Sequence, residues 1–270
     1  MTPAEFALLE QESQQHRWSR SRAKTWLVIG LVLAFYAACW HLARVDLDRL
    51  AAGLPKIGHW IAQAWPPKID ELPLFLLRTG ETVAMAALGT TIAVTLAIPM
   101  SVLAARNLTP WPRLYVPVRW FLNGLRGIDS FVFALLFVAA VGLGPFAGVL
   151  GIGLHTWGSA AKFFADHLEN TNLAPFEAVR TTGAGRTTAI SYAIVPDVLP
   201  VFASTSLFWW EFNVRASTVL GVVGAGGIGL ELKSSMDLLD FPRLFTIIAV
   251  ILIVVTALDQ LSSWLRRRLV

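Results

Sequence analysis

The stretch TVAMAALGTTIAVTLAIPMSVLAA, residues 82–105, decides the fold class because it contains no charged residue. A helix needs about 20 apolar residues to cross the hydrocarbon core of a bilayer, where no water satisfies backbone polar groups. The composition of the whole chain agrees: 55% of the 270 residues are hydrophobic and 15% are charged, whereas about 25% are charged in ordinary soluble domains. We therefore predict an all-α membrane protein.

Further apolar stretches bring the prediction to about six transmembrane helices. Residues 25–43 carry no Lys, Arg, Asp or Glu, and the last two spans cover about 196–220 and 244–264. The uncharged run 130–161 is too long for one crossing and contains the turn sequence Gly142-Leu143-Gly144-Pro145, so we expect it to hold most of two spans. Basic residues flank the spans mainly on one side, which predicts that both termini are cytoplasmic.

The predicted organisation is a cytoplasmic tail over 1–24, a first span over 25–43, a periplasmic segment over 44–78 and a core of the remaining spans over 79–268. The first span resembles a signal peptide, but no convincing cleavage site follows it, so we predict a retained anchor in the inner membrane. In the periplasmic segment, large apolar residues recur at helical spacing among charged ones. This pattern predicts an amphipathic helix on the outer interface, where packing over the bundle is favoured over direct contact with a partner.

Several other classes of protein are disfavoured. The single cysteine, Cys39, cannot form an internal disulfide, and the net charge of +4 comes from short basic clusters between apolar stretches rather than from a nucleic-acid surface. Residues 224–229 read GAGGIG and fit the G-x-G-x-x-G pattern. A dinucleotide site would require a strand before these glycines and a helix after them, whereas here they follow a membrane span. We expect Gly224, Gly226, Gly227 and Gly229 to form a sharp periplasmic turn or a close helix contact.

The longest predicted cytoplasmic connection, about 170–196, has the features of a short helix. Pro175 suits its first turn, Glu177 suits its positive end and Gly183 suits its termination. On physical grounds alone, an ordinary loop helix is the favoured interpretation.

The same residues resemble the EAA loop of ABC-importer permeases, whose pattern is EAA, three residues, Gly, nine residues and I-x-L-P. Here Glu177-Ala178-Val179 precedes Gly183, and the loop ends at Val195-Pro196. Val179, Ala193 and Val195 depart from the usual residues. A finer resemblance to the phosphonate-type (PhnE-like) permease family covers about residue 76 to the C-terminus. It is carried by residues 104–107 (AARN), 136–138 (LFV), 141–150 (VGLGPFAGVL), 154–156 (LHT), 212–216 (FNVRA) and 219–229 (VLGVVGAGGIG).

This resemblance implies a type I ABC-importer permease fold and a division of labour among several chains. No G-x-x-x-x-G-K-[ST] phosphate loop occurs, so ATP and Mg would bind partner ATPase subunits and this chain would be no enzyme and bind no cofactor. The implied complex has two permeases, with a homodimer favoured, two ATPases and a periplasmic or lipid-anchored binding protein, all at the lipid membrane. Glu177, Ala178 and Arg180 would contact the ATPase, and Gly183 would form the turn between two helices. The expected cargo is phosphonate, phosphate or phosphite.

Charged residues inside the membrane are costly and usually face a cavity or a partner. Glu211 and Arg215 lie four residues apart in the fifth span and can pair with each other. The alternative is that four residues line the path of an anion: Arg215, partly neutralised by Glu211, with His155 and Asn213. A guanidinium group offers paired donors to phosphorus oxyanions. Asp259, in the last span, is expected to pair with a basic neighbour.

A secondary transporter for a small anion, driven by an ion gradient, is the competing functional class. Such a transporter should show a coupling carboxylate near the middle of the membrane, often within an internal repeat. The two halves show no convincing repeat, and Glu211 has an arginine one turn away. A channel or a structural membrane protein is a weaker third option.

Overall fold

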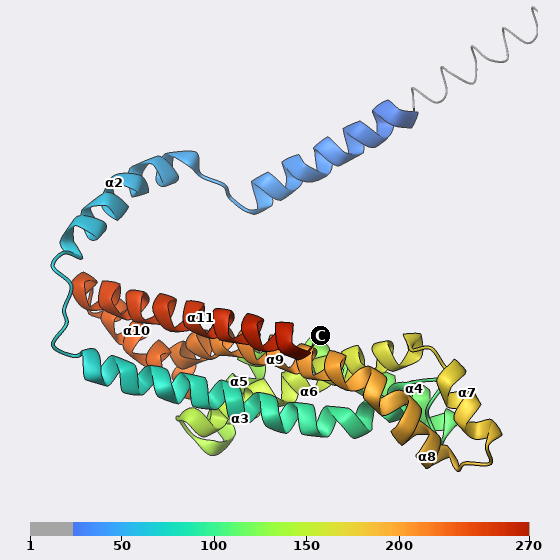
Figure 1. Cartoon of the computed structure of the whole chain (residues 1–270). Helices are drawn as coiled ribbons and strands as arrows, with labels where there is room; N and C mark the ends of the chain where they lie inside the picture. The colour runs from blue at the N-terminus through green and yellow to red at the C-terminus, as the bar shows by residue number, and fades with distance from the viewer. Residues whose placement is uncertain (1–23, 270) are drawn as a thin grey trace, which may run out of the picture. The chain divides into compact units, whose positions relative to one another are not determined.

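The computed structural model describes residues 24–269, and within these residues it contains helices and connecting turns but no strand (Figure 1). The predicted all-α class is therefore confirmed. The chain divides into two compact units, Met1–His59 and Trp60–Val270. The predicted tail over 1–24 lies outside the described residues except for Lys24.

The N-terminal part contains a helix over Lys24–Leu42 that is exposed along its whole length. Helix α2 follows over Leu47–Gln63 and begins with Asp48 in its first turn. It has no buried residue, so its apolar face is left largely exposed by the chain itself. The predicted amphipathic helix thus exists, and its position on the outer interface remains a prediction.

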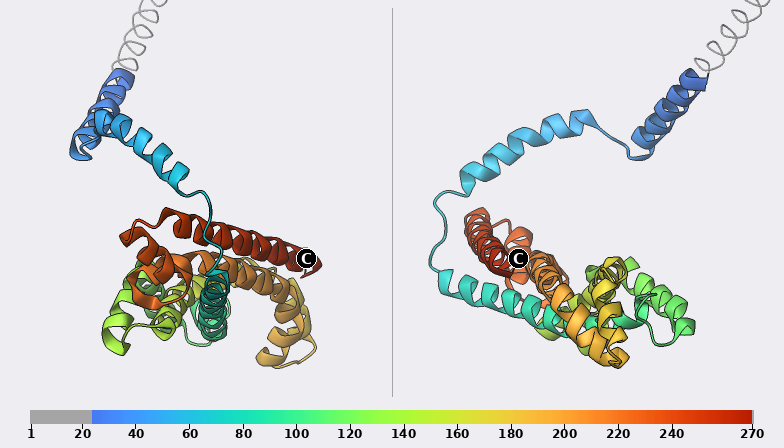
Figure 2. Two further views of the ribbon diagram at one scale, coloured as in Figure 1. Left: turned by 90° about the vertical axis from the view of Figure 1, so that its left-hand side faces the viewer. Right: turned by 45° about the vertical axis from the view of Figure 1, so that its right-hand side comes forward.

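The second unit contains the rest of the helices. They are α3 (Leu72–Ala104), α4 (Pro112–Gly127), α5 (Ser130–Val141), α6 (Pro145–Asn170), α7 (Ala174–Thr181), α8 (Arg186–Ala189), a π-helical segment (Ile190–Ile194), α9 (Val195–Leu220), a second π-helical segment (Gly221–Ala225), α10 (Ile228–Asp237) and α11 (Phe241–Leu269). Figures 1 and 2 show α11 beside α9, with α10 at one end of this unit and α7 and α8 at the other.

The number of apolar spans is close to the predicted six. Four of the described helices are long and apolar enough to cross a membrane, and the pair α4 and α5, bent by 84°, makes up to five. The remaining predicted span, the fourth, corresponds to α6, a helix of 26 residues that is less apolar because of its glycines, His155 and Lys162. The expected turn between the third and fourth spans is present, since α5 ends at Val141 and α6 begins at Pro145.

Two predicted boundaries differ from the structure. Helix α3 begins at Leu72, ten residues before the uncharged stretch, because Arg78 and Glu81 pair with each other and can remain inside the helix. Helix α5 has 12 residues and is about 18 Å long, shorter than the roughly 30 Å of a bilayer core.

Helix α6 forms the centre of the bundle and packs against α3, α4, α5 and α9. Its buried residues are mostly Gly, Ala, Ser and Thr, and small residues of this kind allow helix backbones to approach closely. One core cluster joins Leu122 of α4, Phe164 of α6 and Trp209 of α9. This core positions the helix ends and turns at both ends of the bundle.

Candidate functional site

The predicted helix in the cytoplasmic connection is present as α7, with Pro175 in its first turn and Glu177 near its start. The chain then turns at Gly183, which has φ +85 and where an added side-chain carbon would meet no atom within 4 Å. Glycine is therefore favoured at this position by backbone conformation and not by lack of space. Helix α8 begins three residues later, at Arg186, and leads directly into α9.

Helix α7 separates an apolar face from an exposed polar face. Phe176, together with Leu173 just before the helix, packs against a buried cluster of Ala105, Leu108, Leu168, Ile194 and Val198. The predicted ATPase contacts Glu177, Ala178 and Arg180 are all exposed. Within the described part of the chain, neither Glu177 nor Arg180 forms an ion pair, so both remain available to another protein.

The turn between α3 and α4, residues 105–111, is a meeting point of polar contacts that the sequence did not reveal. Asn107 donates to the carbonyl oxygen of Leu168 at 2.8 Å, and the backbone N–H of Arg106 donates to Glu169 at 2.7 Å. Arg119 of α4 donates to the carbonyl oxygen of Ala104 at 3.0 Å. The same guanidinium pairs with two carboxylates of α6, Asp166 and Glu169, each at 2.9 Å. These contacts fix the ends of α3, α4 and α6 relative to one another.

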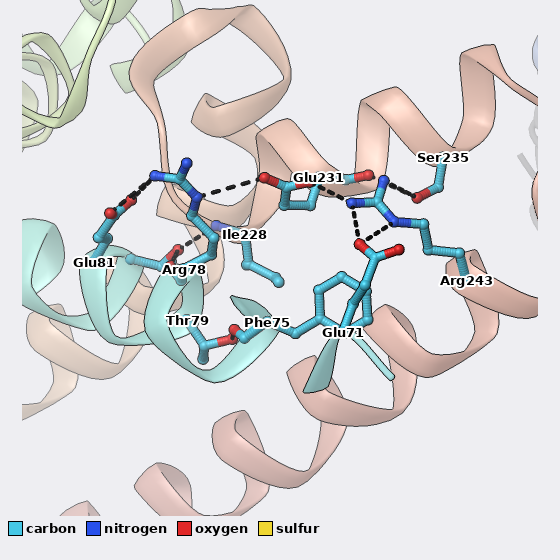
Figure 3. A network of polar contacts seen from close by, with 10 residues as sticks. Glu71, Phe75, Arg78, Thr79, Glu81, Ile228, Glu231, Ser235 and Arg243 are labelled. Carbon is cyan, nitrogen blue, oxygen red and sulfur yellow. Dashed lines mark hydrogen bonds and ion pairs between the residues drawn. The ribbon is translucent and has the colours of Figure 1, made fainter. Parts of the chain in front are cut away.

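A second polar network lies at the opposite end of the bundle and joins α3, α10 and α11 (Figure 3). Arg243 is 12% exposed and pairs with Glu71 at 2.9 Å and with Glu231 at 2.7 Å. It also donates to the hydroxyl of Ser235 at 3.1 Å. Glu231 also pairs with Arg78 at 3.4 Å. Glu231 therefore connects one arginine of α3 with one arginine of α11.

The connection between α10 and α11 adds another ion pair at this end. Lys68 donates to Asp240 at 3.1 Å, and the backbone N–H of Arg243 donates to the same carboxylate at 3.2 Å. Partial burial alone would raise the pKa of Asp240, but the hydrogen bonds from Lys68 and from the Arg243 backbone, with the charges of both residues, leave this pKa below its ordinary value.

The glycine-rich run forms a turn at the same end of the bundle. Gly224, Gly226 and Gly227 have φ values of +95, +78 and +71, a region that residues with a side chain rarely adopt. Gly229 lies in α10 against the carbonyl oxygen of Thr218, where a side-chain carbon would be only 2.0 Å from that oxygen. Because the described residues before this run are helical, the strand that a dinucleotide site requires is missing.

The turn is also tied to its neighbours. The backbone N–H of Gly144 donates to the carbonyl oxygen of Gly224 at 3.0 Å, and the N–H of Ile228 donates to the hydroxyl of Thr82 at 2.9 Å. The glycines therefore connect the end of α9 with α3 and with the turn before α6.

The charges of α9 and α11 form an ion network of Glu211, Arg215, Asp259 and Arg266. Glu211 accepts from Arg215 at 2.9 Å and from Arg266 at 2.6 Å, and Arg215 is 3.4 Å from Asp259. The predicted pairing of Glu211 with Arg215 is confirmed, as is a basic partner for Asp259. Arg266 was not expected in this network, because the basic run at the C-terminus gave no indication of its partner.

The structure does not bring the four proposed path residues together. His155 of α6 contacts the carbonyl oxygen of Ile128 at 2.8 Å and the ring of Trp209, and it shares no contact with Arg215. Asn213 is fully buried, where it donates to the hydroxyls of Thr90 and Thr156 at 2.8 and 2.9 Å. In this conformation Asn213 faces no open path, and its amide holds α3, α6 and α9 together.

Comparison with known proteins extends these observations. Residues 97–270 match the family described as "Binding-protein-dependent transport system inner membrane component". HtxC of Stutzerimonas stutzeri, named as a phosphite transport system permease protein, is 44% identical over 236 residues, which cover 87% of this chain and 84% of HtxC. The phosphite transport system permease protein PtxC of the same organism is 39% identical over 250 residues, covering 93% of this chain and 90% of PtxC.

A solved structure of the MetNI methionine ABC transporter, in an inward-facing conformation, has a TM-score of 0.66 to this chain at 20% sequence identity. The match covers 75% of this chain and 99% of that one. At this identity the likeness concerns the fold, and it confirms the predicted type I ABC-importer permease fold.

Proposed function

This chain belongs to the family of inner membrane components of binding-protein-dependent transport systems, and from that premise we propose that it forms the membrane path of an ATP-driven importer for a phosphorus oxyanion. It is a multi-pass membrane subunit and not itself an enzyme. The ATPase and the substrate-binding protein are separate chains of such a system. The proposed complex contains two copies of this chain, two ATPase subunits and one binding protein, with both termini of the permease in the cytoplasm.

The observation that carries the proposal is that α7 has one apolar face packed on the bundle and one exposed polar face. Its apolar side is fixed to the bundle through Phe176, while Glu177, Ala178 and Arg180 are exposed and uninvolved in packing. A short rigid helix held in this way can be displaced as one body by a partner that closes on ATP. We assign α7 as the coupling helix and Gly183 as the turn that lets the chain re-enter the membrane.

The cargo is proposed from the names of similar proteins together with the charges of the chain. Two of these relatives are named as phosphite transport permeases, and a third, at 36% identity, is named as a phosphate-import permease, PhnE, of Mycolicibacterium smegmatis. Arg215, the arginine placed on the proposed path, is already paired with Glu211 and Asp259, so it would hold an oxyanion only weakly. A weak path of this kind suits transport, in which the binding protein selects the ligand and the permease must release it.

The proposal can be tested with the chain reconstituted in liposomes together with its ATPase and binding protein. Uptake of labelled phosphite, phosphate and methylphosphonate should require ATP on the side of the membrane that holds the ATPase, and it should be unaffected by collapse of ion gradients. Glu177→Ala should weaken ATPase co-purification, whereas Asp237→Asn, which removes an exposed charge at the other end of the bundle, should not. Uptake driven by an ion gradient in the absence of the ATPase would refute the proposal and favour a secondary transporter.

A further inference from the structure

The coupling segment, residues 172–189, contains α7, the Gly183 turn and α8. Besides its apolar packing, one polar side chain attaches it to the bundle. In the described structure, Arg186 is the only side chain of residues 172–189 that hydrogen-bonds a residue outside this segment. Its Nη2 atom donates to the carbonyl oxygen of Leu108 at 2.9 Å and to that of Thr109 at 3.3 Å. Both carbonyls belong to the turn between α3 and α4.

Arg186 lies in the chain between α7 and the long helix α9, so a displacement of α7 reaches α9 through this residue. It follows the Gly183 turn and is the first residue of α8, which is continuous with α9. Without its contact to the turn, α7 is connected through the chain only to α6, on one side, and to α9 through α8, on the other. With the contact, a displacement also reaches α3 and α4, because the turn joins these two helices.

The turn passes the displacement further to α6. Asn107 and the backbone of Arg106 bind the end of α6 at Leu168 and Glu169, and Arg119 links α4 with the same end. The turn thus connects four helices through hydrogen bonds, which are directional. The apolar contacts of α7 hold it against the bundle but are non-directional, so they do not fix its orientation as hydrogen bonds do.

From these contacts we propose that Arg186 is a positioning residue of the coupling mechanism. Its guanidinium holds the coupling segment to the turn between α3 and α4, so that movement of α7 is transmitted to α3 and α4 as well as to α6 and α9, which the chain itself joins to α7. The carbonyls of Leu108 and Thr109 receive directed donors from one rigid planar group, a geometry that lysine cannot reproduce in full. This inference rests on the proposed function, because it assumes that α7 is moved by an ATPase.

The variants that test the proposal are Arg186→Gln and Arg186→Lys, with Arg113→Gln as the matched control. Arg113 is an exposed arginine of α4 without an ion pair among the described residues, so its change removes the same charge from a nearby surface. Arg186→Gln should keep ATPase co-purification and basal ATP hydrolysis but lower the phosphite taken up per ATP hydrolysed by at least about threefold. Arg186→Lys should fall between Arg186→Gln and the unchanged protein, and Arg113→Gln should behave as the unchanged protein.

A direct measurement of position separates this role from a general loss of stability. Spin labels at Thr181→Cys and Arg113→Cys, in a Cys39→Ser background, report the distance between α7 and α4 in nanodiscs without any transport. The distance distribution should be narrow with Arg186 present and clearly broader in Arg186→Gln, at an unchanged melting temperature. An unchanged distance distribution in Arg186→Gln would overturn the proposal. A broader distribution together with a lower melting temperature would also overturn it, because the broadening would then reflect a general loss of stability.

The two assays also distinguish the inference from its premise. Absence of ATP-driven uptake by the unchanged complex counts against the proposed function, and the spin-label distances still decide whether Arg186 fixes α7. Normal uptake per ATP by Arg186→Gln, in a complex that transports normally when unchanged, counts against Arg186 alone.

Discussion

The ion network between α9 and α11 predicts unequal effects of removing Glu211 and Arg215. Glu211 is 13% exposed and accepts from two arginines, so Glu211→Gln removes two charge-assisted contacts at once. Arg266 then loses its only ion-pair partner among the described residues, whereas Arg215 keeps Asp259. Charged hydrogen bonds contribute about 1.5–3 kcal/mol each when buried, and partial exposure reduces this, so we expect a cost of about 2 kcal/mol.

Arg215→Gln should cost less. The Arg215 side chain is 46% exposed, and its removal leaves the short contact between Glu211 and Arg266 intact. Asp259 loses its partner, but that contact is long, at 3.4 Å, and the Asp259 side chain is 37% exposed. We expect about 1 kcal/mol or less. The double change Glu211→Gln with Arg215→Gln should not restore the original stability, because Arg266 and Asp259 both remain without their partners.

Melting of the purified complex in one detergent, followed by uptake per assembled complex, measures both consequences. The ranking of melting temperatures should place Arg215→Gln above Glu211→Gln, with the double variant no better than Glu211→Gln. An Arg215→Gln melting temperature as low as that of Glu211→Gln would refute the central place given to Glu211. If Arg215→Gln keeps its melting temperature but loses uptake, and the double variant also fails to transport, Arg215 acts on the anion.

Three further changes test the two ends of the bundle. Gly183→Val places a β-branched residue at φ +85, a conformation that such residues rarely adopt. Uptake should fall by several-fold, while membrane insertion, measured by fractionation and blotting, should persist. Normal uptake would show that the turn is not needed for coupling. Gly229→Ala should lower the melting temperature, because the added side-chain carbon would clash with the backbone oxygen of Thr218. Gly80→Ala should leave the melting temperature unchanged, because the added carbon meets no atom within 4 Å. Equal melting temperatures of the two variants would contradict the close packing at Gly229. The lowered pKa of Asp240 means that its contribution to stability is present above its ordinary value of about 4 and is lost as pH falls through the lowered value. Lys68→Ala should therefore reduce the loss of stability measured by melting between about pH 6 and pH 3, and an unchanged pH profile would argue against this ion pair.

Much of the fold followed from local features of the sequence. Long uncharged stretches specify membrane helices without reference to distant residues, and the turn at Gly142 to Pro145 is encoded by residues next to one another. The same holds for α7, because the signals for its first turn, at Pro175, and for its end before Gly183 are both local. The start of α3 was misplaced because Arg78 and Glu81 look unsuited to a span until their pairing is known.

The polar networks could not be predicted, because their partners are far apart in the sequence. Glu231 and Arg78 are separated by more than 150 residues, and nothing near either of them indicates the other. Asn213 was placed on the candidate path together with Arg215 and His155. Its hydroxyl partners, Thr90 and Thr156, come from two other helices and are invisible without the packing. Arg186 likewise gave no signal, because its acceptors are backbone carbonyls.

One long helical segment, from Arg186 to Ala225, connects the Gly183 turn at one end of the bundle with the glycine turn at the other. Its 40 residues correspond to a rod about 60 Å long, and a tilt of about 5° about one end of such a rod moves the other end by roughly 5 Å. The π-helical turns lie near the two ends of this rod, where its hydrogen bonding is least regular. In the proposed coupling mechanism this segment would act as a lever between the two turns, and Pro200 inside α9 adds a further point at which it can bend.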